Sequence, residues 1–206
     1  MKVVALISGG KDSCFNMMEC VKNGHEIVAL ANLHPPESSD KHEMDSYMYQ
    51  TVGHDVILSY ADCMGLPLFR QAIDGSPLNQ DMNYEVTEND ETEDLYKLLS
   101  RIKEVHPDIE GVSVGAIFSS YQSIRVENIC KRLDLTSLAF LWQREQEALL
   151  QDMIDSGLEA ILIKVAAMGL NSSHLGKSLS EMLPVLKNLN SKYGINVCGE
   201  GGSLKV

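Results

Sequence analysis

Apolar and polar residues alternate along this chain on two length scales, and this alternation predicts its secondary structure. Short apolar runs with few polar interruptions are typical of strands buried on both faces of a parallel sheet; they occupy residues 3–7, 27–31, 66–73, 112–118, 138–141 and 160–166. Between them, apolar residues recur at helical spacing in segments that begin near residues 14, 92, 121 and 145. Strands that alternate with helices predict an α/β fold with a doubly wound parallel sheet.

Two segments fit this alternation less simply. Residues 43–65 have helical spacing that is interrupted by Gly53-His54, which predicts two helices. After Gly169 a polar link precedes a helix through residues 182–193 and a short strand at residues 195–198, and Pro184 is expected in the first turn of that helix. A smaller C-terminal α/β portion is therefore expected beside the main sheet.

Charge and cysteine content exclude several classes of protein. The 206 residues carry a net charge of −12 with scattered basic residues, which disfavours a nucleic acid as the main partner because such binding needs clustered Lys and Arg. No apolar run reaches the roughly 18 residues of a membrane helix, and the apolar start is too short for a signal peptide. The five cysteines lack Cys-x-x-Cys spacing. We expect a cytoplasmic protein with no disulfide framework, zinc site or membrane partner.

The segment Ser8-Gly9-Gly10-Lys11-Asp12-Ser13 joins the first predicted strand to the first predicted helix. Adjacent glycines permit a sharp turn and close approach to a ligand, and a helix N-terminus favours phosphate. A Walker loop and a dinucleotide fingerprint both require glycine spacings that are absent here. The helix that follows is expected to be packed along an apolar stripe formed by Cys14, Met17, Met18 and Val21.

The same hexapeptide resembles the pyrophosphate loop of the N-type ATP pyrophosphatases, although a tight turn without a ligand is the alternative. The resemblance implies a HUP-like fold that cleaves ATP to AMP and pyrophosphate at the carboxyl ends of the strands. It assigns ATP binding to Ser8, Gly9, Gly10, Lys11, Asp12, Ser13 and the backbone near Ala31 and Asn32. Asp12 can hold Mg²⁺. Gly115, inside a predicted strand, marks close backbone approach or a bend near a ligand.

A narrower resemblance extends over nearly the whole chain. The blocks 43–54, 115–127, 141–144, 174–176 and 198–202 are similar to those of the diphthine–ammonia ligase family. The resemblance implies that ATP adenylates the diphthine carboxylate on a modified histidine of translation elongation factor 2. Ammonia then gives the amide, with release of AMP and pyrophosphate. No cysteine has the surroundings of a glutaminase nucleophile, so free ammonium is the expected nitrogen source.

Several residues are candidates for the chemistry that this resemblance implies. The catalytic candidates are Lys11, Asp12, Arg125 and Glu200. The candidates for substrate contact are Tyr47, Gln50, His54, Tyr121, Glu127 and Arg144. Each has an ordinary structural alternative: Tyr47 as a core aromatic, and Arg125 with Glu127 as a surface pair on other faces of their helix. Glu200 is a candidate for contacting a trimethylammonium or ammonium group, with Tyr47 and Tyr49 adding cation–π attraction.

We expect an ATP-binding part over residues 1–130 and a smaller, substrate-facing part over residues 131–206. The family resemblance stops after Gly202, which suggests a shortened form whose amidation activity is reduced while ATP binding persists. Two other functions stay open: a tRNA-modifying ATP pyrophosphatase, and an ATP-binding module without catalysis. The net charge of −12 argues against the first of these.

Overall fold

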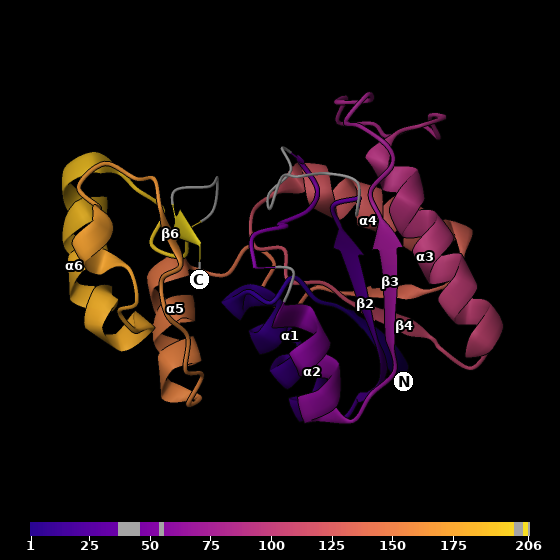
Figure 1. Cartoon of the computed structure of the whole chain (residues 1–206), viewed down its shortest axis with the longest axis horizontal. Coiled ribbons are helices and arrows are strands. Elements are labelled where there is room, and N and C mark those ends of the chain that lie inside the picture. The colour runs from indigo at the N-terminus through magenta and orange to yellow at the C-terminus, as the bar shows by residue number, and fades with distance from the viewer. Residues whose placement is uncertain (37–45, 54–55, 200–203, 206) are drawn as a thin grey trace.

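A five-stranded parallel sheet lies at the centre of the computed structural model, which describes residues 1–36, 46–53, 56–199 and 204–205 (Figure 1). The sheet order is β3-β2-β1-β4-β5, and all neighbouring strands are parallel. The strands are β1 (Lys2–Leu6), β2 (Glu26–His34), β3 (Leu68–Ala72), β4 (Gly111–Ser113) and β5 (Thr136–Leu138). The order reverses between β1 and β4, where a doubly wound sheet binds its ligands.

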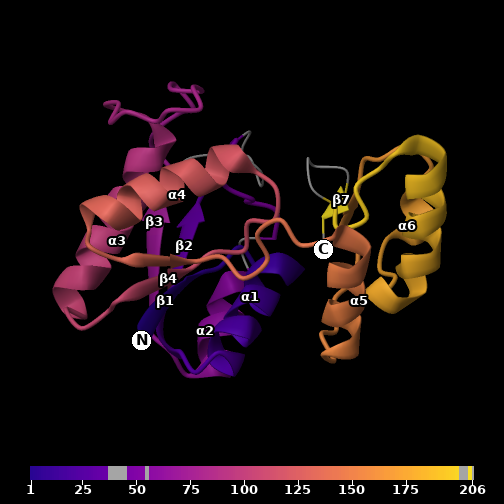
Figure 2. The same cartoon turned by 180° about the vertical axis from the view of Figure 1, so that it is seen from behind.

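Helices cover both faces of this sheet, as Figures 1 and 2 show. They are α1 (Lys11–Lys22), α2 (Ile57–Met64), α3 (Glu91–Val105) and α4 (Ser120–Arg132). Side chains of a strand alternate between faces. Val4 therefore joins a core cluster with residues of α3 and α4, while its neighbour Ala5 joins Met17 of α1 and Ile57 of α2. The predicted doubly wound α/β fold is confirmed.

The C-terminal part forms a separate core beside the sheet (Figure 1). It contains α5 (Gln146–Asp155), the 3-10 helix η2 (Ser172–His174), α6 (Leu179–Tyr193), and the antiparallel pair β6 (Lys164–Val165) and β7 (Leu204–Lys205). Its core is formed by the facing apolar sides of α5 and α6, including Leu149, Met153, Met182 and Leu186. The expected division at residue 130 would fall within α4 and stays a prediction.

Four expectations about local structure were wrong. Residues 160–166 are not a strand of the main sheet: only β6 is extended there, and Ile161 and Ile163 are exposed. Residues 195–198 form no strand. Pro184 is the sixth residue of α6, because a capping box between Ser178 and Glu181 starts this helix at Leu179.

The fourth expectation concerned residues 43–65, where two helices were predicted. Only α2 is present in the described part of this segment, and residues 46–53 are irregular. Two further predicted strands are shorter than expected, because β4 ends at Ser113 and β5 at Leu138. As for membrane segments, none of the helices in the described ranges combines the length and apolar character that a bilayer crossing requires.

Candidate functional site

The loop between β1 and α1 is held by its own serines. Ser13 Oγ donates to Gly10 O at 3.0 Å and accepts from Ser8 N at 3.3 Å. Gly9 has a φ of +78°, a conformation that favours glycine. Gly10 is the N-cap of α1 and has no side chain to occupy the amides of the first turn. The loop therefore presents backbone N–H groups at the positive end of a twelve-residue helix, as an anion site requires.

Gly115 follows β4 and lies against the start of α1. A Cβ atom at this position would lie 2.7 Å from Ser13 N and 2.8 Å from Asp12 C. The expected close backbone approach is confirmed, and its partner is the backbone of the loop itself. Glycine at position 115 lets the chain after β4 pack directly against the first turn of α1.

A cavity of about 570 Å³ opens at this carboxyl edge of the sheet. The loop contributes Ser8, Asp12 and Ser13, while β2 contributes Ala31 and Leu33. The other walls are residues 46–50, the segment 114–116 after β4, the first turn of α4, and Gly199 from the C-terminal part. Polar groups of the loop thus face an irregular segment across a cavity large enough for a nucleotide-sized ligand.

The segment of residues 46–50 is held in place by buried groups behind it. Glu91 accepts hydrogen bonds from Ser46 Oγ at 2.7 Å and from Met48 N at 3.1 Å. Gln122 Nε2 donates to Met48 O at 2.8 Å, and Tyr49 Oη donates to Glu91 O at 2.9 Å. Burial raises the pKa of the Glu91 carboxyl, and the bonds from Ser46 and Met48 lower it in part. These contacts explain why the segment is not helical.

Lys11 and Asp12 differ in the direction of their side chains. Lys11 is buried, and its Nζ donates to Cys198 O at 2.6 Å and to Asp12 Oδ2 at 2.9 Å. It therefore reaches toward the C-terminal part instead of the cavity. Asp12 lines the cavity, and its buried Oδ1 has no hydrogen-bond partner among the described residues. Both roles proposed for these residues stay predictions.

The unpartnered oxygen of Asp12 is the feature that fits a magnesium ion. Mg²⁺ is usually held by one or two carboxylates together with phosphate oxygens and water. Within the described ranges, no cluster of three His, Cys, Asp or Glu side chains could bind a metal alone. One carboxylate beside an anion-binding loop suits a Mg²⁺ ion that arrives with a phosphate ligand.

The second predicted ATP contact lies at the end of β2. Ala31 lines the cavity. The Asn32 side chain is buried, donates to Ile7 O at 2.9 Å, and accepts from Arg70 Nε at 3.1 Å. Asn32 thus ties β2 to β1 and β3 through its side chain, so the predicted contact of Asn32 with a nucleotide would have to be made by its backbone groups.

Arg125 does not have the surroundings that were expected. It is fully buried, not on the helix surface, and it donates to the carbonyl oxygens of Tyr121, Asn79 and Asp81. Its guanidinium lies 3.4 Å from the centre of the Tyr121 ring. The centres of the Tyr121 and Tyr47 rings are in turn 5.7 Å apart. Arg125 and Tyr121 therefore lie behind the cavity wall, and their side chains support an excursion of the chain near residues 79–84.

The remaining candidate site residues separate into three groups. Tyr47 and Gln50 line the cavity. Glu127 is exposed on α4 and accepts from Ser123 Oγ at 2.9 Å, whereas Arg144 forms an ion pair with Asp152. Neither is among the residues lining the cavity. His54 and Glu200 fall outside the described residues.

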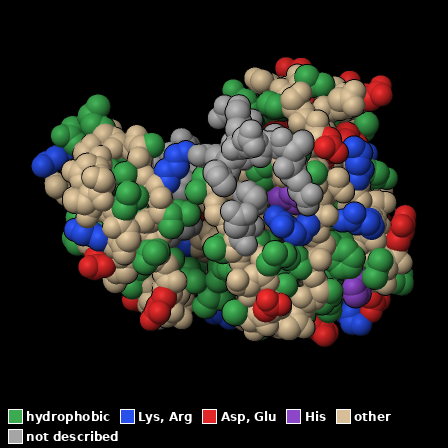
Figure 3. Space-filling model, in the orientation of Figure 1, with side chains coloured by type: hydrophobic (Ala, Val, Ile, Leu, Met, Phe, Trp, Pro, Cys, Tyr) green, Lys and Arg blue, Asp and Glu red, His purple; other side chains and the backbone are tan. Residues whose placement is uncertain are grey.

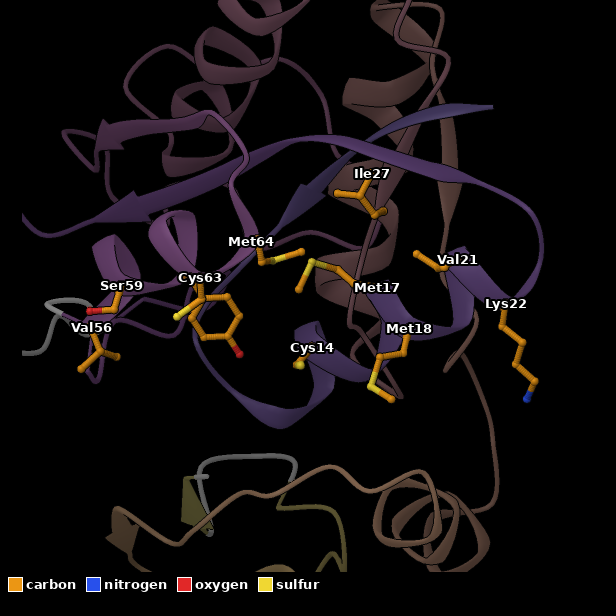
Figure 4. Close-up of a pocket in the computed structure, with 11 residues that line it drawn as sticks. Cys14, Met17, Met18, Val21, Lys22, Ile27, Val56, Ser59, Cys63 and Met64 are labelled. Atoms are coloured by element: carbon orange, nitrogen blue, oxygen red, sulfur yellow. The ribbon is translucent and has the colours of Figure 1, made fainter.

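A second cavity of about 740 Å³ lies between α1 and α2 and is almost entirely apolar (Figure 4). Its walls include Cys14, Met17, Met18 and Val21 of α1, opposite Ser59, Cys63 and Met64 of α2 (Figure 4). The stripe expected to be packed is therefore packed only in part, since Val21 is 60% exposed. This groove offers almost no polar group to phosphate, so the smaller cavity at the loop is the candidate site.

Sequence reasoning missed the residues that assemble the site from a distance. Glu91 accepts from Met48 of the cavity wall, 43 positions away in sequence, and the Cys198 carbonyl accepts from Lys11 of the loop, 187 positions away. Asn16, buried within α1, bonds to Ser113 Oγ at 2.7 Å and to Leu138 O at 2.8 Å. Of these residues, only Asn16 stands out in the sequence, because it is a polar residue within an apolar helical pattern. The pattern does not reveal which residues Asn16 contacts.

Two family models together match most of the chain. The model described as the diphthamide synthase N-terminal domain matches residues 1–137, and the one described as the diphthamide synthase C-terminal domain matches residues 145–206. Among solved structures, a predicted tRNA methyltransferase subunit from Methanocaldococcus jannaschii is similar with a TM-score of 0.38 and 13% identity over 100% of this chain and 96% of that one. The U34-tRNA thiolase NcsA from Methanococcus maripaludis has a TM-score of 0.40 and 16% identity over 97% and 68%. Neither similarity is high enough to assign a residue of the site.

Curated relatives are much more similar in sequence. The diphthine–ammonia ligase of Schizosaccharomyces pombe is 62% identical over 98% of this chain, which spans only 33% of that protein. The diphthine–ammonia ligases of Danio rerio and Homo sapiens are 60% and 59% identical over 98% of this chain, which spans 79% and 76% of those proteins. Both halves of the chain thus match the same family, whose named members are ligases. This chain belongs to the diphthamide synthase family.

Proposed function

We propose that this chain catalyses the ATP-dependent amidation of the diphthine carboxylate on translation elongation factor 2, with ammonium as the nitrogen source. The observation that carries the proposal is the cavity at the loop. There Asp12, whose Oδ1 has no hydrogen-bond partner among the described residues, lines the same cavity as Ser8 and Ser13 of the loop and as Tyr47 and Gln50 of the opposite wall. A phosphate-binding wall opposite a wall of aromatic and amide side chains suits a reaction between a nucleotide and a second substrate.

In the proposed first step, a diphthine carboxylate oxygen attacks the α-phosphorus of ATP. The bond from this phosphorus to the oxygen bridging the β-phosphorus breaks, and pyrophosphate leaves. The amides of α1 and the hydroxyl of Ser8 would stabilise the charge on the phosphates, while Ser13 holds the loop closed through its bond to Gly10 O. Mg²⁺, when bound, would supply further charge neutralisation, and Asp12 is the residue that would hold it.

In the proposed second step, ammonia attacks the carbonyl carbon of the acyl-adenylate. The bond from this carbon to the phosphate oxygen breaks, AMP leaves, and the proton lost from nitrogen passes to solvent. No nucleophile from the protein is required, so the chain's contribution is positioning and charge stabilisation. The Tyr47 ring, exposed at the cavity wall, suits the trimethylammonium group of diphthine through cation–π attraction.

The test is reconstitution with diphthine-bearing elongation factor 2, ATP, Mg²⁺ and labelled ammonium. We expect label in the factor and equal amounts of AMP and pyrophosphate. Asp12→Ala should lower the rate by about 10²-fold to 10³-fold, the loss typical of removing one group that stabilises transition-state charge. Asp62→Ala, which removes an exposed carboxylate from α2, should leave the rate unchanged.

Three outcomes would contradict the proposal. Incorporation that is unaffected by Asp12→Ala would refute the role of the loop. ATP binding without AMP formation would identify a nucleotide-binding module that lacks catalysis. Retention of tRNA at physiological salt, together with AMP formation only when tRNA is present, would identify a tRNA-modifying enzyme.

A further inference from the structure

The chain between β3 and α3 forms a projection, residues 75–90, which we call the hook. Figure 1 shows it extending beyond the start of α3. Its base is closed by hydrogen bonds from Ser76 N to Asn89 O and from Glu91 N to Ser76 O, both at 3.1 Å. Gly75 is required there, because a Cβ atom would lie 2.6 Å from the backbone of Asp90. The two ends of the hook therefore meet at one fixed point.

Buried groups hold the interior of the hook. Arg125 donates to the carbonyl oxygens of Asn79 and Asp81. Asp90 Oδ2 accepts from Leu78 N at 3.0 Å and from Asn79 N at 2.9 Å. Tyr84 is buried beside Arg125, and its hydroxyl donates to Glu93 at 2.9 Å. A fully buried arginine is costly to desolvate, and this cost is offset only when its hydrogen-bond acceptors are in place. The contacts of Arg125 therefore favour the one conformation of the hook that presents the carbonyl oxygens of Asn79 and Asp81 to it.

The outer surface of the hook is apolar and acidic. Leu78, Met82 and Val86 are 57%, 56% and 62% exposed. Asp81, Glu85 and Glu88 are also exposed and, within the described part of the chain, form no ion pair. In Figure 3 the projection over α3 carries both hydrophobic and acidic side chains. Exposed apolar side chains rimmed by charge on a preorganised element are typical of a protein-binding surface.

The charge of this region specifies the kind of partner. Between Arg70 and Lys97 the sequence contains eight carboxylates and no Lys or Arg. Asp90, Glu91, Glu93 and Asp94 are used within the fold, so Asp81, Glu85 and Glu88 are the hook carboxylates available to a partner. A surface of this composition attracts a protein segment in which Lys and Arg accompany apolar side chains.

The hook is also continuous with the cavity. Tyr121 Oη donates to Asn79 O at 3.4 Å, and the Tyr121 ring contacts the ring of Tyr47. Tyr47 is exposed on the cavity wall. A protein bound on the hook would therefore lie at the side of the cavity where Tyr47 is located.

We propose that the hook is the docking surface for the protein that carries the carboxylate, and that it binds a basic segment of that protein. This inference rests on the proposed function, because it assigns a location to that protein substrate. It gives Arg125 and Tyr121 a positioning role behind the surface. Their buried contacts fix the hook, and the hook orients the partner.

The test compares two triple variants with the same change of charge. The hook variant is Asp81→Lys, Glu85→Lys and Glu88→Lys; the control is Asp62→Lys, Glu104→Lys and Glu159→Lys, three exposed carboxylates elsewhere. We expect the hook variant to raise KM for diphthine-bearing elongation factor 2 at least about tenfold. KM for ATP and kcat at saturating factor should be unchanged. A Leu78→Ser, Met82→Ser variant should raise the same KM.

The other outcomes separate the two proposals. If the wild type forms the amide and the hook variants have the KM of the control, the hook is not the docking surface and the proposed function stands. If the wild type neither forms the amide nor binds the factor, both proposals fail. If light scattering shows a wild-type dimer and monomeric hook variants with an unchanged KM, the hook binds a second copy of the chain and the docking proposal is overturned.

Discussion

The two opposite walls of the cavity are built in different ways. The loop of residues 8–13 is held by hydrogen bonds within its own sequence, from Ser13 to Gly10 O and from Ser8 N to Ser13. The segment of residues 46–50 is held by Glu91 of α3 and Gln122 of α4, which lie far along the chain. One wall is a local structure and the other depends on tertiary contacts.

This difference determines how each wall responds to mutation. A loop that closes on itself keeps its shape when distant residues change, and it can be recognised from a short stretch of sequence. A segment held by remote side chains takes its shape from them, so substitutions outside the cavity alter the geometry inside it. Three predictions test this contrast, and the first concerns a place where the loop wall contacts a distant residue.

The largest effect is expected from Gly115→Ala. The added methyl group would lie within 3 Å of backbone atoms of Asp12 and Ser13, which cannot move without distorting the loop. We expect a loss of about 1–3 kcal/mol in the free energy of unfolding. We also expect ATP affinity to fall on the order of tenfold or more, because a small misplacement of binding groups is costly. Urea unfolding and calorimetry measure these two quantities.

Gly176→Ala is the matched control for that experiment. Its added methyl group meets nothing within 4 Å, so only the strain of a φ of +77° remains. ATP affinity that changes equally in both variants would show that the loop does not need β4 beside it.

A smaller effect is expected from Glu91→Ala. This change leaves Ser46 Oγ and Met48 N without their acceptor, which costs about 1–3 kcal/mol in stability. The segment 46–50 should shift, so KM for the protein substrate should rise more than KM for ATP. Glu104→Ala on an exposed position of the same helix is the control. Identical KM values for Glu91→Ala and Glu104→Ala would show that the geometry of the segment 46–50 does not depend on Glu91.

The smallest effect is a dependence on pH. Burial raises the pKa of Glu91 in the folded protein above its ordinary value of 4.5. The folded state thus binds this proton more tightly than the unfolded state, so stability falls as pH rises through the interval between the two pKa values. Glu91→Gln cannot titrate. The wild type should therefore lose stability relative to this variant between about pH 4 and neutral pH.

Urea unfolding of both proteins over this range measures the difference directly. A wild-type stability that rises with pH relative to the variant would mean that the hydrogen bonds from Ser46 and Met48 outweigh burial. The segment of residues 46–50 would then be held by an ionised Glu91, and protonation of Glu91 would weaken its hydrogen bonds to Ser46 and Met48.

The features that the sequence predicted well are those defined over short distances. The strand, loop and helix up to residue 22 follow one another directly, and a repeat of Leu95, Leu98, Leu99 and Ile102 defined the buried face of α3 correctly. In the loop, the spacing of the serines and glycines is enough to close the turn. The doubly wound α/β fold followed from the order of such local elements.

The errors arose where tertiary contacts override a local pattern. The apolar run at residues 160–166 has the composition of a buried strand, yet it lies beside α6 and leaves Ile161 and Ile163 exposed. Arg125 was a catalytic candidate, with a surface pair on its helix as the structural alternative, but it is buried, and the carbonyl oxygens of residues 79 and 81 accept its hydrogen bonds inside the fold. The sequence around residues 160–166 does not indicate their contact with Ser178, and the sequence around Arg125 does not indicate its contacts with residues 79 and 81. These contact partners are more than ten positions away along the chain.

The hydrogen bond from Lys11 to Cys198 O has a consequence for how the two parts of the molecule communicate. The Lys11 ammonium belongs to the loop proposed to bind phosphate, yet its hydrogen bond reaches the C-terminal part. A ligand that attracts this ammonium competes with the Cys198 carbonyl, so occupancy of the loop and attachment of the C-terminal part are coupled equilibria. By thermodynamic reciprocity, attachment of the C-terminal part would then change ligand affinity at the loop by the same factor by which ligand binding changes the attachment.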